Sequence, residues 1–316
     1  MKPSDLKNKR RKALNLRVLV YLCPCNVSVN APTGGMGGRS LNSAKMKKYA
    51  LDLKVVECRL LQADYVLLRL ALPINLPLGD IRPGQFVEVR VDGCPEVFLR
   101  RPVSVHYIDT AKGELWLLIR RIGPGTAALG RLRAGDRLNV IFPLGNGFSM
   151  PERAGARALL VGGGVGCAPL LYLGEKLLEK GCEPVFLLGA KTANLLVQNE
   201  LFSRLGRVCT TTEDGSAGEQ GFVTGHSILQ GGGGGGGDAS GPADFDIIYV
   251  CGPLPMMKAV ARYARNRGIP CEVSLENKMA CGLGACLCCV ENTTEGHLCV
   301  CTDGPVFNID RLLWQI

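Results

Sequence analysis

Short apolar runs rich in β-branched residues dominate the chain from about residue 49 to residue 151, and turns containing Pro and Gly separate them. Runs of this length, bounded by turn residues, are typical of strands. About six such strands suggest a closed barrel. We expect the strands over residues 51–60, 65–72, 86–91, 103–107, 115–120 and 138–141. One short helix is expected over residues 125–132.

The apolar pattern then changes, and strand-like runs alternate with helical ones. A buried strand over Ala158–Val161 precedes a helix over Pro169–Lys180. Further strands are expected over residues 185–188 and 245–251, and a second helix over Pro255–Arg267. Alternation of this kind predicts a parallel, doubly wound sheet.

A chain of 316 residues suits two domains with a small third. The changes of pattern predict a β-barrel domain at residues 48–152, an α/β domain at 153–270 and a cysteine-rich domain at 271–316. A pure glycine tract at 231–237 interrupts the α/β domain. We expect this tract to be a flexible surface loop of high chain entropy.

The net charge of +9 belongs to the first part of the chain. Residues 1–48 hold eleven Lys or Arg and one acid, a balance of +10, which leaves −1 for residues 49–316. The body of the protein therefore has no excess charge for a phosphate backbone, which disfavours nucleic acid as a partner. The apolar run Val18–Cys23 is too short for a signal peptide. We expect residues 1–47 to be a disordered basic extension, or to precede a true start at Met46.

Six of the fifteen cysteines fall between Cys281 and Cys301. Cys281, Cys286 and Cys289 show the spacing C-x4-C-x2-C, and Cys301 follows twelve positions later. This is the plant-type spacing for a [2Fe–2S] cluster, in which one tight loop supplies three thiolates and a later residue the fourth. Gly282 suits such a loop because glycine permits positive φ. Clustered cysteines also indicate a reducing cytoplasm rather than a disulfide framework.

Two other interpretations of the cysteines remain open. Zinc prefers two separated C-x2–4-C pairs, and only Cys286 and Cys289 form one. Disulfides are the third option. Cys288 and Cys299 are spare thiols beside the proposed ligands, so the register of the ligand set is also open. A buried cysteine without a ligand role is common, and we expect that role for both.

A glycine-rich segment lies where the strand Ala158–Val161 ends and the next helix begins. It reads Gly162-Gly163-Gly164-Val165-Gly166 and ends at Pro169. Glycines let the backbone approach a pyrophosphate, and the helix N-terminus offers free amides. Tight strand–helix packing would need the same residues. The segment Cys251-Gly252-Pro253 at the end of a later strand favours a nucleotide, because ligands bind at the carboxyl ends of such sheets.

A third segment, Arg100-Arg101-Pro102-Val103-Ser104, enters a barrel strand, and Leu118-Ile119-Arg120 and Gly125-Thr126 follow it. An arginine and a hydroxyl can hold a diphosphate, and a helix start adds amides. Taken alone, a surface arginine pair is more often solvated.

With these three segments in order, the chain resembles the ferredoxin–NAD(P) reductase-like flavoproteins, and among them the iron–sulfur electron-transfer subunits of NAD-dependent dihydroorotate dehydrogenase. The likeness covers roughly residues 48–310. It is carried by the three segments above, by Glu213–Ser216, Gly221–Thr224 and Pro255–Met257, and most specifically by Glu276–Cys289 and Cys301–Phe307.

The resemblance implies a cofactor for each segment. FAD would lie on Arg101, Pro102, Val103, Ser104, Leu118, Ile119, Arg120, Gly125 and Thr126. NAD would lie on Gly162, Gly163, Gly164, Val165, Gly166, Cys251, Gly252 and Pro253. The cluster would be held by Cys281, Cys286, Cys289 and Cys301, which favours Cys301 over Cys299 as the fourth ligand.

The resemblance also implies a function and a partner. Flavin can exchange both a hydride and single electrons, so it belongs between NAD and a one-electron cluster. A separate FMN-containing catalytic subunit would oxidise dihydroorotate, in a heterotetramer with two copies of each chain. No catalytic acid or base is required, and His106 is expected to be structural. The alternative is a subunit of another NAD(P)H-linked system that serves ferredoxin, sulfide, sulfite or hydrogenase, and a third interpretation is a zinc-binding or thiol-sensing regulator.

The choice between NAD and NADP depends on the end of the second parallel strand. This strand ends at Gly189-Ala190-Lys191, where no carboxylate accepts a ribose hydroxyl. Lys191 could even bind a 2′-phosphate. The resemblance favours NAD.

Overall fold

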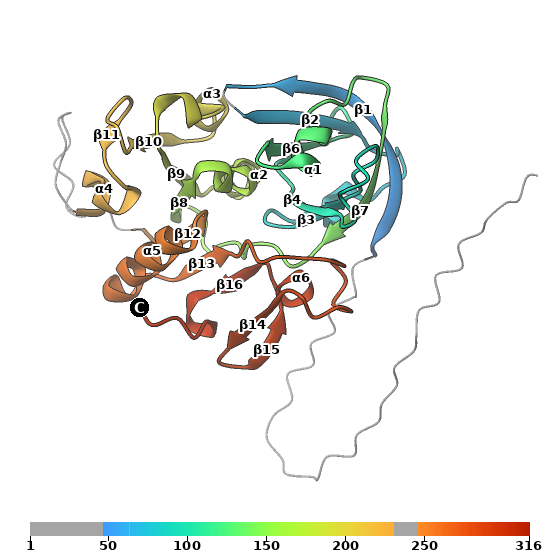
Figure 1. The fold of residues 1–316 in the computed structure, drawn as a ribbon. Helices are drawn as coiled ribbons and strands as arrows, with labels where there is room; N and C mark the ends of the chain where they lie inside the picture. The colour runs from blue at the N-terminus through green and yellow to red at the C-terminus, as the bar shows by residue number, and fades with distance from the viewer. Residues whose placement is uncertain (1–46, 63, 231–244) are drawn as a thin grey trace, which may run out of the picture. The chain divides into compact units, whose positions relative to one another are not determined.

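The computed structural model describes residues 47–62, 64–230 and 245–316 (Figure 1). The predicted extension, apart from Lys47, and the glycine tract at 231–237 lie outside these residues. Within the described ranges, no helix has both the length and the apolar character needed to cross a bilayer.

The first half of the described chain forms one antiparallel sheet of seven strands in the order β4-β3-β7-β1-β2-β6-β5. The strands are β1 (Tyr49–Leu60), β2 (Tyr65–Ala71), β3 (Phe86–Val89), β4 (Arg101–Ser104), β5 (Tyr107–Asp109), β6 (Glu114–Arg120) and β7 (Arg137–Leu144). Helix α1 (Pro124–Leu129) follows β6. The sheet curves but its edges, β4 and β5, do not pair in the described structure, so the predicted closed barrel is wrong and the barrel is open.

The single strand expected over 103–107 is two strands. Val105 and His106 separate β4 from β5, and both residues are fully buried. The amide of Val105 donates to the carbonyl of Gln85 and that of His106 to the carbonyl of Trp116, at 2.9 and 3.0 Å. The chain therefore crosses from one edge of the open barrel to the other at this point.

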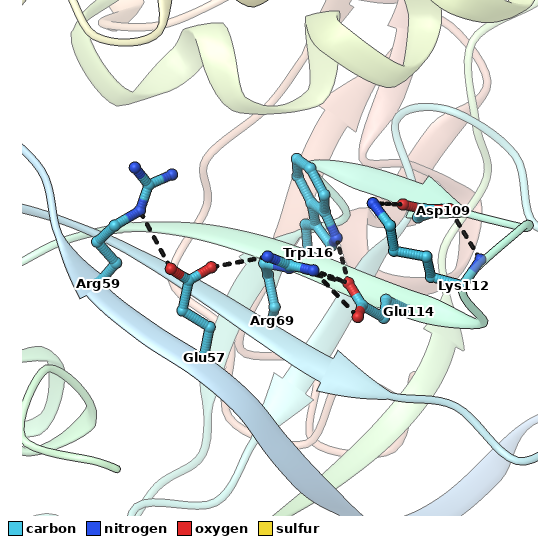
Figure 2. Close-up of polar contacts among 7 residues, drawn as sticks. All are labelled: Glu57, Arg59, Arg69, Asp109, Lys112, Glu114 and Trp116. Carbon is cyan, nitrogen blue, oxygen red and sulfur yellow. Dashed lines mark hydrogen bonds and ion pairs between the residues drawn. The ribbon is translucent and has the colours of Figure 1, made fainter. Parts of the chain in front are cut away.

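The outer face of the barrel carries a polar network centred on Arg69 (Figure 2). Its guanidinium donates to Glu57 at 2.9 Å and to Glu114 at 2.8 and 3.1 Å. The indole of Trp116 donates to the same Glu114 carboxylate, and the ring lies 5.2 Å from the Arg69 guanidinium carbon. The inner face is apolar and holds the barrel core, including Val55, Leu68, Val87, Leu117 and Val140.

The second half forms a sheet in the order β11-β10-β9-β8-β12-β13-β16, parallel except for the pair β13–β16. Its strands are β8 (Arg157–Gly163), β9 (Glu183–Ala190), β10 (Arg207–Thr212), β11 (Glu219–Gln220), β12 (Ile247–Cys251), β13 (Cys271–Ser274) and β16 (Val306–Asn308). The helices are α2 (Ala168–Glu179), α3 (Asn199–Ser203), α4 (Ser227–Gln230) and α5 (Leu254–Arg267). The chain order reverses between β8 and β12, which is where ligands bind in such sheets.

The cysteine-rich segment joins this sheet. It carries the hairpin β14 (Val290–Thr293) and β15 (Gly296–Cys299), and α6 (Val300–Asp303). Strand β16 then pairs antiparallel with β13. The boundary predicted at residue 270 assigns both β13 and β16 to a separate domain, whereas the structure hydrogen-bonds them into the α/β sheet (Figure 1).

Candidate functional site

The loop from Cys281 to Cys289 turns sharply and aims amides at sulfur. Gly282 and Gly284 have φ of +66° and +81°, the left-handed region that favours glycine. The amide of Leu283 lies 3.3 Å from Cys281 Sγ, and the amide of Gly284 lies 3.2 Å from Cys301 Sγ. Donors fixed in this way stabilise negative charge on sulfur, as a thiolate ligand requires.

The four predicted ligands occur as two hydrogen-bonded pairs. The Cys281 thiol is hydrogen-bonded with that of Cys286, and the Cys301 thiol with that of Cys289. Partial burial opposes ionisation of Cys281, but the amides of Leu283, Cys286 and Ala285 outweigh it and lower its pKa to about 6. Burial, together with the Cys289 partner, raises the pKa of Cys301.

The spare thiols differ from this set. Cys288 is exposed and Cys299 is half-buried, whereas Cys289 and Cys301 are buried. Every cysteine in the described residues is a free thiol. Within the same residues, no three His, Cys, Asp or Glu side chains converge on one point suited to a single metal ion.

The buried carboxylate of Glu88 on β3 lies against the cysteine loop. It is fully buried, and neither oxygen has a hydrogen-bond partner among the described residues. A Cβ added at Gly282 would lie 2.9 Å from its Oε1, so glycine is required there by contact as well as by φ. Burial raises the pKa of Glu88 to about 7 against the opposing charge of Arg100. The barrel therefore contributes directly to the environment of this loop.

A cavity of about 450 Å³ lies at the carboxyl ends of β8, β9 and β10. Gly163 and Gly164 line it from the glycine-rich loop. A Cβ on Gly166 would overlap the carbonyl of Cys251, and one on Gly163 would lie 2.9 Å from Pro253. The loop and the end of β12 are thus packed together by glycine. Of the predicted NAD residues, Gly163, Gly164 and Pro253 line the cavity, and Gly162, Val165, Gly166, Cys251 and Gly252 do not.

Cys251 is the one predicted NAD residue with a potentially nucleophilic side chain, but that side chain is buried in the core. Its pairing with Gly162 in the sheet register holds it beside the loop. Burial raises its pKa well above the usual value, although Ser274 offers a hydrogen bond. Cys251 is therefore a neutral thiol at physiological pH.

The barrel contributes two polar groups to the cavity. Tyr65 from β2 and Arg120 from β6 line it together with Gly163 and Gly164. The Tyr65 hydroxyl and Arg120 Nε are buried and have no partner within the described chain. Buried polar groups are normally paired, so these two indicate a missing polar ligand. Arg120 thus lines this cavity, a position that its expected role in binding FAD did not anticipate.

The remaining predicted FAD residues form a separate group. Arg101 lies beside Gly125, where an added Cβ would be 3.0 Å from its Nε. Thr126 Oγ1 accepts from the amides of Ile122 and Gly123 at 3.0 and 3.2 Å and so caps α1. Pro102 is exposed, and Val103 and Ser104 are half-buried.

The segment Leu118–Arg120 can contact a cofactor mainly through its backbone. The side chains of Leu118 and Ile119 are 1% and 3% exposed and belong to the core. Strand β5 pairs with β6 only over Glu114–Trp116, so this edge of β6 has no β5 partner beyond Trp116. The residues present therefore fit a flat cofactor laid along β4, the β6 edge and the start of α1.

Sequence reasoning assigned no site role to two cavity residues, Tyr65 and Glu213. Glu213 follows β10, and its amide donates to the carbonyl of Ala190 at 3.1 Å. This contact brings its carboxylate to the same cavity wall as Lys191. A carboxylate thus lies at the end of β10, although the second strand has none. The available signal was the segment Glu213–Ser216, one of those that carried the resemblance.

Two family models match the chain. Residues 276–313 match the iron-sulfur cluster binding domain of dihydroorotate dehydrogenase B, and residues 160–262 match the oxidoreductase NAD-binding domain. The cysteine loop and the glycine-rich loop therefore fall within the matched regions.

Curated relatives agree with these matches. The electron transfer subunit of dihydroorotate dehydrogenase B (NAD(+)) from Shouchella clausii is 40% identical over 238 residues, 73% of this chain and 86% of its own. The subunit of the same name from Lysinibacillus sphaericus is 41% identical over 234 residues, 72% and 86% of the two chains.

Solved structures show the fold. A structure of NADH-dependent reduced ferredoxin-NADP oxidoreductase superposes with a TM-score of 0.71 at 29% identity, covering 88% of this chain and 92% of that one. A ferredoxin reductase of carbazole 1,9a-dioxygenase superposes with a TM-score of 0.55 at 21% identity, covering 72% and 68%. The predicted fold class, a flavin-type barrel followed by an α/β nucleotide domain and a cysteine-rich region, is confirmed.

Proposed function

This chain belongs to the electron-transfer subunits of NAD-dependent dihydroorotate dehydrogenase B, and from that premise we propose how it holds its redox groups. The cluster is a [2Fe–2S] centre on Cys281, Cys286, Cys289 and Cys301. The observation that carries this proposal is the pairing of the four thiols, with backbone amides aimed at Cys281 and Cys301.

We assign FAD to the barrel. Arg101, with Gly125 and Thr126 at the start of α1, provides the charge and the amides for its diphosphate. Ser104 adds a hydroxyl, Pro102 and Val103 shape the same strand, and the backbone of Leu118 and Ile119 borders the ring. When bound, a flavin exchanges two electrons with NAD and single electrons with a cluster.

We assign NAD to the cavity at the carboxyl ends of β8, β9 and β10. Gly163 and Gly164, just before α2, line this cavity and would border the pyrophosphate with their backbone, and Pro253 after β12 lines it as well. Arg120 supplies a positive charge that this loop itself lacks. Glu213 is placed to accept the ribose hydroxyls, which supports NAD over NADP.

The partner is a catalytic subunit of dihydroorotate dehydrogenase, as the name of the relatives implies. We further propose that it carries FMN and that two copies of each chain assemble in the cytoplasm. The exposed side chains of Leu283, Cys286 and Leu287 lie on the cluster loop. A partner seated on this loop brings the two redox centres close.

The decisive experiment is co-expression of this chain with the catalytic subunit encoded in the same genome, followed by anaerobic purification. The complex should reduce NAD+ when dihydroorotate is added, and the catalytic subunit alone should reduce only an artificial acceptor. A complex containing Cys301→Ser should lose NAD+ reduction but keep the artificial-acceptor activity. If this chain instead purifies from its host with a different oxidoreductase, the alternative NAD(P)H-linked system is correct.

A further inference from the structure

His106 lies between the proposed FAD strand and the proposed NAD loop. It follows Ser104 of β4 by two residues and is fully buried. Its Nδ1 lies 2.7 Å from the carbonyl oxygen of Ala168, the first residue of α2. Its Nε2 lies 2.8 Å from Oε1 of the Gln198 side chain, at the start of α3. The imidazole of His106, in the barrel, thus contacts the first turns of two helices of the α/β domain, α2 and α3.

The hydrogen-bond roles follow from the partners. A carbonyl only accepts, so Nδ1 carries the proton and donates to Ala168. Burial lowers the pKa of His106 against the opposing effect of its two hydrogen bonds. In a neutral ring with the proton on Nδ1, Nε2 is an acceptor. The structure places Oε1 of Gln198 at Nε2, so the amide must be turned over for its nitrogen to donate there, a change that amide symmetry allows. This orientation also pairs the Gln198 nitrogen that is otherwise buried without a partner in the described structure.

Gln198 occupies a constrained backbone position. Its φ of 60° is left-handed, which is uncommon for a residue other than glycine. Its carbonyl accepts from the amide of Leu201 at 2.8 Å and so begins α3. A strained position persists only where its surroundings hold it. The contact with His106 is one such restraint, and it extends from the barrel.

We propose that His106 is a positioning residue that fixes the glycine-rich loop and α2 relative to the flavin strand, and so sets the approach of the nicotinamide to the flavin. This inference rests on the proposed function. A displacement of about 1 Å in such an arrangement can cost on the order of 100-fold in rate. His106 suits this role because it acts on the first residue of α2, directly after Gly162–Cys167.

Other barrel contacts with α2 act further along the helix. Tyr172 donates its hydroxyl to the carbonyl of Ile81 at 3.2 Å. Tyr107 donates to Glu175, and its ring lies 6.1 Å from that of Tyr172. These contacts begin one turn beyond Ala168. They hold the helix to the barrel without touching its first residue, which makes Tyr172 a matched control.

The test compares His106→Leu, His106→Asn and His106→Gln with Tyr172→Phe, all in the FAD- and cluster-loaded complex. Stopped-flow absorbance measures reduction of FAD by NADH, and titration measures NADH affinity. His106→Leu should slow FAD reduction at least tenfold with less than a threefold change in affinity. His106→Asn keeps a donor at the Nδ1 position and should recover most of the rate, whereas His106→Gln should not. FAD content should be unchanged in all variants.

Tyr172→Phe should lower the melting temperature while FAD reduction stays within twofold of wild type. Rates within twofold of wild type in His106→Asn, His106→Gln and any folded His106→Leu would overturn the positioning role. Equal slowing of FAD reduction by Tyr172→Phe would overturn it too, because the loss of any contact between the barrel and α2 would then be enough to slow the reaction. If the wild-type complex itself showed no FAD reduction by NADH, the proposed function would fail instead.

Discussion

The side-chain amide of Asn146 donates a hydrogen bond to the carbonyl of Thr302, 3.1 Å away, and a second to that of Asp303 at 3.0 Å. Asn146 follows β7 of the barrel, and Thr302 directly follows the proposed ligand Cys301. The barrel end therefore holds the segment that carries the fourth thiolate.

Asn146→Ala should weaken the attachment of the Cys301 segment to the barrel. Two hydrogen bonds are lost and two carbonyls are left without that partner, at a cost of about 1–3 kcal/mol. We expect the visible iron–sulfur absorption to decay several-fold faster in the presence of an iron chelator. Asp246→Ala removes bonds to Arg153 and to the Arg157 amide, away from the cysteines, and serves as the control. Equal decay in both variants would show that general destabilisation is responsible.

The ligand register is tested at the adjacent residues Cys288 and Cys289. Cys289 is buried and hydrogen-bonded with Cys301, whereas Cys288 is exposed. Cys289→Ser should therefore lose the iron–sulfur absorption and Cys288→Ser should keep it. Iron and sulfide analysis of the purified variants, with FAD content as the control, provides the measurement. The reverse pattern would assign the third ligand to Cys288.

Local sequence signals predicted the elements that depend on local chemistry. The left-handed Gly282 and Gly284, and the glycine-rich strand–helix turn, were identified because few residue types can occupy such positions. The helix expected over Pro255–Arg267 was found as Leu254–Arg267. In each case a few adjacent residues determine the outcome.

Features that depend on distant residues could not be predicted in the same way. The pairing of β16 with β13 joins segments more than thirty residues apart, and their short apolar runs give no register. The open barrel follows from the break at Val105–His106, where two buried residues interrupt an apparently continuous strand. Glu213 reaches the cavity only because β10 and β9 are neighbours. Each of these features depends on which strands become neighbours in the tertiary structure.

Glu213 should determine the preference for NADH over NADPH. A carboxylate beside the ribose accepts its hydroxyls and repels a 2′-phosphate. Glu213→Gln should shift the ratio of kcat/KM for NADH to that for NADPH toward NADPH by about tenfold, equivalent to about 1.4 kcal/mol. Lys191→Ala, on the same wall, should shift the ratio in the opposite direction. A wild-type preference for NADPH would contradict this assignment.

Arg69 should stabilise the barrel through its contacts with Glu114 (Figure 2), whose side chain is only 8% exposed. Arg69→Met leaves that carboxylate without its cation and should lower the free energy of unfolding by about 2–4 kcal/mol, somewhat less than for a fully buried pair. Arg59→Met removes only a 3.4 Å contact with Glu57 by a side chain that is 56% exposed. Its cost should be below about 1 kcal/mol. Denaturant unfolding measures the free energy of unfolding of both variants. Equal losses would show that burial of the Glu114 carboxylate does not require the charge of Arg69.

Arg120 distinguishes the two nucleotide sites. Its Nε is buried without a partner in the described residues, and it lines the cavity with Gly163 and Gly164. Lost hydrogen bonds to a charged group cost about 1.5–3 kcal/mol, so Arg120→Met should raise KM for NADH by about 10- to 150-fold. FAD content should remain at one per chain, because Arg101 is the residue proposed for the flavin diphosphate. Tyr65→Phe removes only a neutral hydroxyl from the same wall and should raise KM less. If Arg120→Met instead released FAD and left KM for NADH unchanged in the remaining holoprotein, Arg120 would be a flavin ligand.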